Sequence, residues 1–445
     1  MGVYDIYKSK LKTAEEAVKA VKDGDWVDYC QGLAFPIALD EALAGRKDEL
    51  FDVKVRNGVG LLPSKVVLAD PEMEHFTYTL WHCSGGDRKL IAEKKAYFSP
   101  MLFRYVGDYY KKGLAKVNVV MVTVAPMDEY GNFSFGLTNC CMQEIIDAAD
   151  IVIVEANAKM PKVYGLEKDY INIRDVDIVV ESDIDLPVIP DIPPTETDMK
   201  IAGHIMPYLK DGVTIQIGIG GTPSAVGQMI SESDIKDIGM HTEQLNNGYL
   251  HLYKAGKLTN KKKEIDTGKG VFSVCAGDKE LYDFIRDNLA FASAPIRYTN
   301  DPAVMAAFKD FVSINGCISV DLFGQVSSES AGLRQISGTG GQLDFVNGAF
   351  ETESGYSFLT MPSTHRNKDG SVSSNVIPYF TEGDIITVPR AQASYIVTEF
   401  GVACLHGGTT WERAERLIDI AHPDFRDELI KAAEAASIWR KTNKR

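Results

Sequence analysis

The sequence predicts an α/β protein made of two open domains, each a mostly parallel sheet flanked by helices. Three observations favour this fold class: a length of 445 residues, β-branched apolar runs that alternate with helix-like segments, and a proline-rich segment near the middle. Apolar runs without polar alternation are typical of strands buried on both faces, as in a parallel sheet covered by helices. A chain about three times the length of a typical domain has room for two full cores.

The first half is expected to begin with a short amphipathic helix in TAEEAVKAVKDGD. Thr13 and Glu16, three residues apart, form the sequence pattern of a capping box at its start. Apolar runs then predict strands in DVKVRNGVG, KVNVVMVTVAP and ADIVIVEAN. The segments between them, LFRYVGDYYKKGLA and CMQEIIDAAD, predict helices.

The segment LPVIPDIPPTET contains four prolines, Pro187, Pro190, Pro193 and Pro194. Proline removes a backbone donor and fixes an extended geometry, so neither a helix nor a central strand is expected here. We therefore expect an N-terminal α/β domain at residues 1–190 and a C-terminal α/β domain at residues 191–445.

The second half repeats the alternation of helices and strands. A helix is expected through DMKIAGHIMPYL, a strand in VTIQIGIG and a second helix from PSAVGQMI. Further strands are expected in GVFSVCAG, DFVSINGCISVDLFGQV and GDIITVPR, followed by a helical tail.

Composition and charge exclude several classes of function. The formal net charge of −15 repels nucleic acid and anionic membranes, so neither is expected as a partner. No apolar stretch of about 20 residues and no signal-peptide pattern is present, which predicts a cytoplasmic protein. The seven cysteines are scattered without a C-x-x-C pair, and the histidines lack metal-ligand spacing. We expect reduced, mostly buried thiols and no metal.

A first glycine-rich loop follows the strand in VTIQIGIGGTPSAVGQMI. The expected strand ends at Ile217, Thr222 can cap the following helix, and Pro223 suits the first helical position. Free backbone amides at such a helix start can bind an anion or a carbonyl oxygen. A plain strand-to-helix turn explains the same residues equally well. The spacing differs from G-x-G-x-x-G, which disfavours a dinucleotide site.

A second glycine-rich loop lies in QISGTGGQLDF, with glycines at 338, 340 and 341. Glycines at this density permit a close approach of backbone to ligand, and their amides can stabilise an oxyanion. A plain loop of this composition would cost much chain entropy, so the sequence favours a ligand-binding loop over a structural one.

Glu243 lies in GMHTEQLNNG, without a neighbouring arginine or lysine. A lone glutamate is usually a solvated surface residue. A carboxylate can also be a nucleophile, provided that an oxyanion site is present and water is excluded. The two glycine loops favour this second interpretation, and the absence of G-x-S-x-G disfavours a serine hydrolase. His241 is expected to be a hydrogen-bonded loop residue.

Several ordered segments carry a family resemblance. They are GIGGTPSAV, HTEQLNNG, YTNDP, SINGCISVDLFGQV, SGTGGQLDF, ITVPR, YIVTEFGVACLHG and AHPDFR in the second half, with VAPMDEYGNFSFGL and FPIALDEAL in the first. Together they resemble the acetyl-CoA hydrolase/transferase family of CoA-transferases, and within it the butyryl-CoA:acetate and 4-hydroxybutyrate CoA-transferases. The resemblance implies two open α/β domains of the CoA-transferase type.

The resemblance also implies roles for individual residues. Glu243 matches the glutamate that forms a glutamyl-CoA thioester in this family, and Asn300 matches an asparagine that holds the acyl oxygen. Gln244 departs from the family pattern, which has an apolar residue there, and so bears on acyl preference. The residues that match CoA contacts are Gly218, Ile219, Gly220, Gly221, Thr222, Ile318, Gly340 and Gly341.

The implied reaction moves CoA from butyryl-CoA to acetate through a glutamyl-CoA thioester, in a ping-pong sequence. A 4-hydroxybutyrate or propionate CoA-transferase, an acetyl-CoA hydrolase and a non-catalytic CoA-binding protein remain alternatives. Coenzyme A would be a substrate, without a tightly bound cofactor, and the partners would be acyl-CoA and short-chain carboxylates. No cation adjoins Glu243 in the sequence, which favours a monocarboxylic acyl group over succinyl. A homo-oligomer, dimer or tetramer, is also expected.

Overall fold

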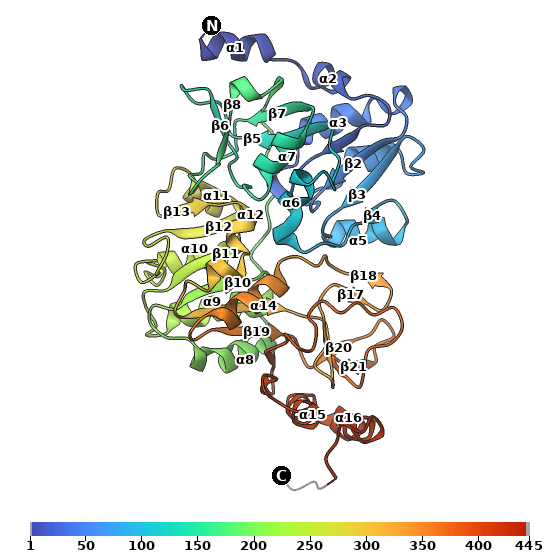
Figure 1. The fold of residues 1–445 in the computed structure, drawn as a ribbon, viewed down its shortest axis with the longest axis vertical. Coiled ribbons are helices and arrows are strands. Elements are labelled where there is room, and N and C mark those ends of the chain that lie inside the picture. Colours follow the sequence, from blue (N-terminus) through green and yellow to red (C-terminus); the bar gives the residue numbers. More distant parts are fainter. Residues whose placement is uncertain (1, 442–445) are drawn as a thin grey trace.

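The computed structural model describes residues 2–441 and contains two large sheets, one in each half of the chain (Figure 1). The first sheet has seven strands, and every neighbouring pair in it is parallel. Its strands are, in spatial order, β4 (Tyr97–Phe98), β3 (Phe76–Leu80), β2 (Val53–Asn57), β1 (Trp26–Asp28), β5 (Val119–Val124), β7 (Ile151–Asn157) and β9 (Ile178–Ser182).

The second sheet has eight strands, which are parallel except for the last pair. The predicted fold class, two mostly parallel sheets flanked by helices, is therefore confirmed. The strands are, in spatial order, β13 (Phe291–Ser293), β12 (Gly270–Cys275), β11 (Gly239–Leu245), β10 (Thr214–Ile217), β14 (Phe311–Gly316), β19 (Tyr356–Thr360), β23 (Tyr395–Thr398) and β24 (Gly401–Cys404).

Helices pack around both sheets (Figure 1). Those of the first half are α1 (Val3–Lys10), α2 (Ala14–Ala17), α3 (Ile37–Ala44), α4 (Lys65–Ala69), α5 (Gly85–Ala92), α6 (Val106–Lys111) and α7 (Met142–Ala148). Those of the second half are α8 (Glu196–Ile205), α9 (Gly221–Glu232), α10 (Asn247–Lys254), α11 (Lys279–Ile285), α12 (Ile296–Thr299), α13 (Pro302–Met305), α14 (Gln342–Glu351), α15 (Thr410–Asp419) and α16 (Pro423–Ala435).

In the first half, the predicted strands are β2, β5 and β7, and the predicted helices contain α6 and α7. All six residues of β5 are buried, which is why its sequence is apolar at every position except Thr123. The capping box of Thr13 and Glu16 is confirmed at α2. The expectation that the fold begins there is wrong, because α1 precedes α2. No residue of α1 is fully buried, although Val3, Ile6 and Tyr7 pack against the apolar core of the first half.

The proline-rich segment is extended, as expected. No helix or strand occurs between the end of β9 at Ser182 and the start of α8 at Glu196. The segment lies against the second half, since the Ile189 amide donates to the Gly277 carbonyl at 2.8 Å and the Tyr282 hydroxyl donates to the Pro187 carbonyl at 2.9 Å. Its backbone groups are thus partly satisfied without a sheet of its own.

Two local predictions in the second half are wrong. GDIITVPR forms no strand: Val388 makes only an isolated antiparallel bridge with Val326, and Pro389, which has no N–H, cannot continue it. The helix α9 begins at Gly221 with Gly220 as its N-cap, two residues before the predicted start. Thr222 therefore does not cap α9; its hydroxyl donates to Asp198 Oδ1 at 2.9 Å.

The two halves meet where the strands of the second sheet end. Glu243 lies near the carboxyl end of β11, and the first glycine loop follows β10 directly. From the first half, Thr138 pairs with Val274 of β12 and the Asn139 amide donates to the Ser273 carbonyl at 3.0 Å. In open α/β sheets, ligands bind in the crevice outside the carboxyl ends of the strands. This junction is the expected place for a site.

We expect Ile215→Ala to lower the free energy of unfolding by about 2–5 kcal/mol, because it opens a cavity under β10. Ile215 is fully buried, in register with Met240 and Val312 on the neighbouring strands. Leu333→Ala is the control: Leu333 is 91 % exposed, and its loss should change stability by less than about 0.5 kcal/mol. Urea denaturation followed by circular dichroism measures both. Equal shifts in the two variants would contradict the burial argument.

Candidate active site

Glu243 is a strand residue rather than a loop residue. The segment GMHTEQL forms β11, with Glu243 half-buried near its end, so the expectation of a loop around His241 is wrong. The expected hydrogen bond of His241 is present, with Nε2 at 2.9 Å from the Thr299 carbonyl oxygen. Burial lowers the pKa of His241 to about 3, so this ring is neutral and packs against Phe308. His241 thus supports the strand.

The Glu243 carboxylate accepts a short hydrogen bond from an amide. Asn300 Nδ2 donates to Oε2 at 2.6 Å, across a sequence separation of 57 residues. Burial raises the pKa of Glu243 to about 7, although the Asn300 side chain and the Gly341 backbone amide, both hydrogen-bonded to it, act to lower that pKa. Desolvation outweighs the donors, so the carboxylate is less stable and more basic than one in water.

The second glycine loop passes directly over this carboxylate. A Cβ atom on Gly341 would lie 2.0 Å from Asn300 Nδ2 and 2.2 Å from Glu243 Oε2, so only glycine fits. Gly340 has a φ of 59°, in the left-handed region that glycine favours, and its carbonyl accepts from the Phe103 amide at 3.1 Å. The loop therefore brings a backbone amide to Glu243 and is itself held by the first half.

The first glycine loop divides between the cavity and the protein interior. Gly218 and Ile219 line the main cavity, and Gly220 lines an adjoining hollow. Asn246, from the same segment as Glu243, donates to the Gly218 carbonyl at 3.1 Å and so fixes the loop against β11. Gly221 faces the Asp198 carboxylate of α8 together with Thr222, away from the cavity.

Both halves line one cavity of about 500 Å³. Its second-half wall includes Glu243, Gln244, Gly340 and Gly341, together with the first glycine loop. Ile318 does not line it; its amide donates to the Ser327 carbonyl at 2.8 Å, beyond the end of β14. The first-half wall was not predicted from the sequence, since no local motif marks it. That wall includes Gln31, Leu33, Val59, Leu61, His82, Arg88 and Phe103.

Two polar side chains of the first half, Arg88 and His82, line the cavity. Arg88 lines the cavity and donates from Nε to the Ile336 carbonyl, so the expectation that no cation lies near the site is wrong. Burial lowers the pKa of His82 to about 4, so this ring is neutral, and its Nε2 lies 3.3 Å from Ser337 Oγ. Arg88 comes from α5, far from Glu243 in the sequence, which is why local sequence inspection could not find it.

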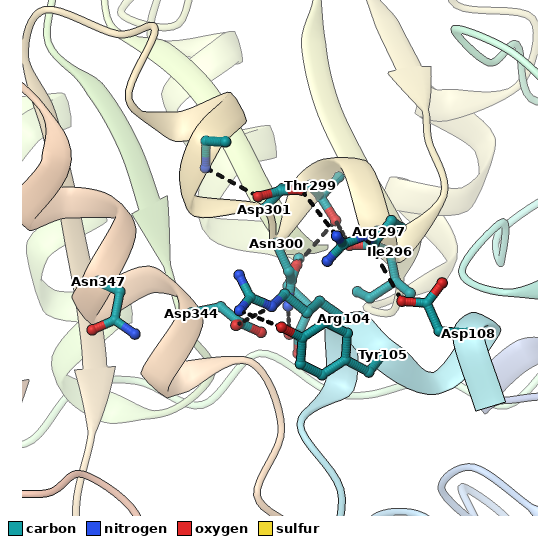
Figure 2. Close-up of polar contacts among 12 residues, drawn as sticks. Arg104, Tyr105, Asp108, Ile296, Arg297, Thr299, Asn300, Asp301, Asp344 and Asn347 are labelled. Carbon is teal, nitrogen blue, oxygen red and sulfur yellow. Dashed lines mark hydrogen bonds and ion pairs between the residues drawn. The ribbon is translucent and has the colours of Figure 1, made fainter. Parts of the chain in front are cut away.

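A buried ion pair between the two halves, Arg104 with Asp344, also borders the site. Figure 2 shows Arg104 from the first half directed at Asp344 from the second, next to Asn300. Arg104 Nε lies 3.1 Å from Asp344 Oδ1. Asp344 is in the first turn of α14, which starts directly after Gly341. The ion pair thus lies beside the loop that contacts Glu243.

Neither a metal centre nor a transmembrane helix is found in residues 2–441. No group of three or more His, Cys, Asp or Glu side chains in that range could hold a metal ion. No helix there is both long enough and apolar enough to cross a membrane. All seven cysteines are unpaired and five of them are buried, as expected for reduced thiols.

Known proteins resemble the chain in both sequence and structure. A Syntrophomonas wolfei subsp. wolfei protein, named "Probable butyrate:acetyl-CoA coenzyme A-transferase", is 48% identical over 98% of each chain. The butyryl-CoA:acetate CoA-transferase of Anaerostipes caccae is 44% identical over 100% of each chain. The crystal structure of RipA from Yersinia pestis superposes with a TM-score of 0.90, covering 98% of this chain and 100% of that chain at 33% identity.

The family match extends over both halves. Residues 1–190 match the acetyl-CoA hydrolase/transferase N-terminal domain, and residues 277–433 match the acetyl-CoA hydrolase/transferase C-terminal domain. The family resemblance inferred from the sequence is confirmed by these matches. With the fold, the cavity between the halves and full-length relatives all in agreement, the chain belongs to the acetyl-CoA hydrolase/transferase family.

Proposed function

We propose that this protein is a CoA-transferase that moves CoA from butyryl-CoA to acetate, with Glu243 as the covalent nucleophile. The observation that carries the proposal is the Glu243 carboxylate itself, held at a cavity wall between the Asn300 side-chain amide and the Gly341 backbone. In this proposal, the domain of residues 1–190 supplies the acyl wall, and the domain of residues 191–445 supplies the nucleophile and the glycine loops.

The first half-reaction needs no proton transfer. A Glu243 oxygen attacks the thioester carbonyl carbon, the C–S bond breaks, and CoA leaves as a thiolate from a mixed anhydride. The thiolate then attacks the glutamyl carbonyl carbon, the anhydride C–O bond breaks, and butyrate leaves. Glutamyl-CoA thioester remains. Acetate attacks that thioester, and the same two steps in reverse give acetyl-CoA and free Glu243.

Amide donors are suited to the charge that develops in these steps. Each tetrahedral intermediate carries an oxyanion, which preorganised N–H groups stabilise strongly in a site shielded from water. Asn300 Nδ2 and the backbone amide of Gly341 adjoin the Glu243 carboxyl group, where the glutamyl oxyanion would form. Gly218 and Ile219 supply further backbone at the same cavity.

Burial of Glu243 serves the reaction in two ways. A carboxylate with a pKa of about 7 is a stronger base and nucleophile than a solvated one, yet a large share of it is ionised near neutral pH. Its position in a cavity between the two halves also limits the access of water to the anhydride and the thioester. Limited access of water favours a transferase over a hydrolase that uses the same glutamate.

The cavity wall favours a short apolar acyl group. Leu33, Val59, Leu61 and Phe103 line it from the first half. An apolar pocket discriminates by only about 1–3 kcal/mol per methylene, so propionyl-CoA should react as well. 4-Hydroxybutyryl-CoA is the second candidate donor, because Gln244 lines the same cavity and carries an amide that can bond to a hydroxyl. Succinate should also be tested as a substrate acid, because the Arg88 guanidinium at the cavity could pair with its second carboxylate.

We expect Glu243→Gln to abolish CoA transfer and Glu243→Asp to slow it by about 100-fold, because shortening the side chain withdraws the nucleophile by about 1 Å. Mass spectrometry of the wild-type protein incubated with butyryl-CoA should find a CoA adduct on Glu243. Double-reciprocal plots at several acetate concentrations should be parallel.

Two results would contradict this mechanism. Transfer at the wild-type rate by Glu243→Gln would remove the glutamate from the chemistry. Rapid release of CoA from butyryl-CoA in buffer without any carboxylic acid would identify a hydrolase instead.

The rate of CoA transfer should decrease as the pH is lowered below neutrality. Because the pKa of Glu243 is raised to about 7, the carboxyl group takes up a proton below that pH and can no longer attack. We expect kcat/KM for butyryl-CoA to fall about tenfold per pH unit well below pH 7 and to level off above it. Enzyme held at pH 5.5 and returned to pH 8 for assay is the stability control. A flat profile between pH 5.5 and 8 would contradict an ionising nucleophile of this pKa.

Gly341→Ala should reduce kcat by about 100-fold or more while the protein remains folded. The added methyl group would overlap both Asn300 Nδ2 and Glu243 Oε2, and the φ of −102° at Gly341 is one that alanine adopts freely. Gly85→Ala is the matched control, since a Cβ there meets no atom within 4 Å. Steady-state kinetics and thermal melting of both variants test the expectation. Equal activity in the two variants would show that Gly341 does not crowd the reacting groups.

A further inference from the structure

The buried ion pair between Arg104 and Asp344 joins the two halves next to the nucleophile. Arg104 follows Phe103, which lines the cavity, and Asp344 follows Gly341 by three residues in α14. The Asp344 side chain is 1% exposed and that of Arg104 is 17% exposed. A buried pair of this kind is a weak source of stability, because desolvation of both charges offsets their attraction. Its position therefore suggests a role beyond stability.

Two consecutive residues of the first half contact the chain on either side of Gly341. The Phe103 amide donates to the Gly340 carbonyl at 3.1 Å, and Arg104 pairs with Asp344 at 3.1 Å. Gly341 lies between these two attachment points, and its backbone amide is hydrogen-bonded to Glu243. A shift of the loop by about 1 Å would misplace that amide, and errors of this size in catalytic groups can cost about 100-fold in rate.

Asp344 is also a second carboxyl group close to Glu243. Burial raises the pKa of Asp344 to about 8, with a contribution from the Glu243 charge, although the Arg104 guanidinium acts to lower it. Arg104 is the cation that holds Asp344 at this point of the interface, at 3.1 Å.

A second guanidinium in this region, that of Arg297, is more exposed than that of Arg104. The guanidinium of Arg297 lies 5.3 Å from the Tyr105 ring, and that of Arg104 lies 4.6 Å from the same ring. Arg297 is 45% exposed and pairs with Asp108 at 3.9 Å and with Asp301 at 3.7 Å (Figure 2). The carboxylate of Asp301 also contributes to the raised pKa of Asp344.

We propose that Arg104 is a positioning residue for the reaction, acting through Asp344. It fixes the start of α14 so that the Gly341 amide stays on Glu243. The proposal rests on Glu243 being the nucleophile, as in the proposed function. Arg104 contacts neither Glu243 nor the cavity directly, so its effect is transmitted by its partner.

The test is steady-state kinetics with butyryl-CoA and acetate in variants of the full-length chain. In Arg104→Gln we expect kcat to fall at least about tenfold with little change in KM, because the Gly341 amide moves away from Glu243. Arg104→Lys should recover part of this loss. In the double variant Arg104→Gln/Asp344→Asn the loss should not exceed that of the worse single variant, because both residues act through one contact.

Asp344→Asn alone gives a test that does not depend on loss of Arg104. It removes the contact from the α14 side, so kcat should fall by a factor similar to that of Arg104→Gln. Arg297→Gln is the matched control: it removes a guanidinium from the same ring, but an exposed one, and should leave kcat unchanged. Thermal melting of every variant separates loss of fold from loss of function.

The outcomes distinguish this inference from the proposed function. Wild-type kcat in both Arg104→Gln and Asp344→Asn, with only the melting temperature lowered, would reduce the ion pair to a structural contact and overturn the inference. Failure to find any CoA adduct on Glu243 in the wild-type protein would overturn the proposed function instead. An adduct in the wild-type protein with unchanged kcat in both variants would refute the positioning role alone.

Discussion

A partly desolvated carboxylate is the constraint on which the rest of this structure depends. The Glu243 carboxylate accepts a hydrogen bond from the Asn300 side-chain amide, and burial raises its pKa to about 7. Its surroundings must limit the access of water, because water would both solvate it and hydrolyse its acyl derivatives. The strand β11 brings it to the sheet end, the second glycine loop crosses it without a side chain, and the first half closes the cavity. Each of these features is needed because of the same desolvated group.

The site exists only where the two halves meet. The second sheet supplies Glu243, Asn300 and both glycine loops, yet the second loop is tied to the first half through Phe103, Arg104 and Arg88. Contacts from both halves thus hold Gly341 against Glu243. The geometry of the reacting groups is therefore a property of the interface between the halves, and stability of that interface bears directly on rate.

The sequence predicted those strands and site residues that are determined by local residue patterns. Continuous apolar runs identified the central strands β5, β7, β10 and β12, and the motifs around Glu243 and the glycine loops identified residues that the structure brings to one cavity. Their roles as CoA contacts stay predictions, as does the division at residue 190. Failures occurred where tertiary contacts override a local pattern: the Thr222 hydroxyl bonds to Asp198 instead of capping α9, and GDIITVPR meets no neighbouring strand over most of its length. Arg88 and Arg104 could not be found at all, because their partners lie in the other half of the chain.

The origin of the cavity walls has an evolutionary consequence. The apolar residues that would surround an acyl chain, Leu33, Val59, Leu61 and Phe103, belong to segments of the first half that carry none of the proposed chemistry. The nucleophile and its amide donors belong to β11, the end of α12 and the second glycine loop. Substitutions that enlarge, shrink or polarise the acyl wall can therefore accumulate without disturbing the reacting groups. A lineage built on this architecture is free to diversify in the acids that it exchanges while inheriting one unchanged chemical step.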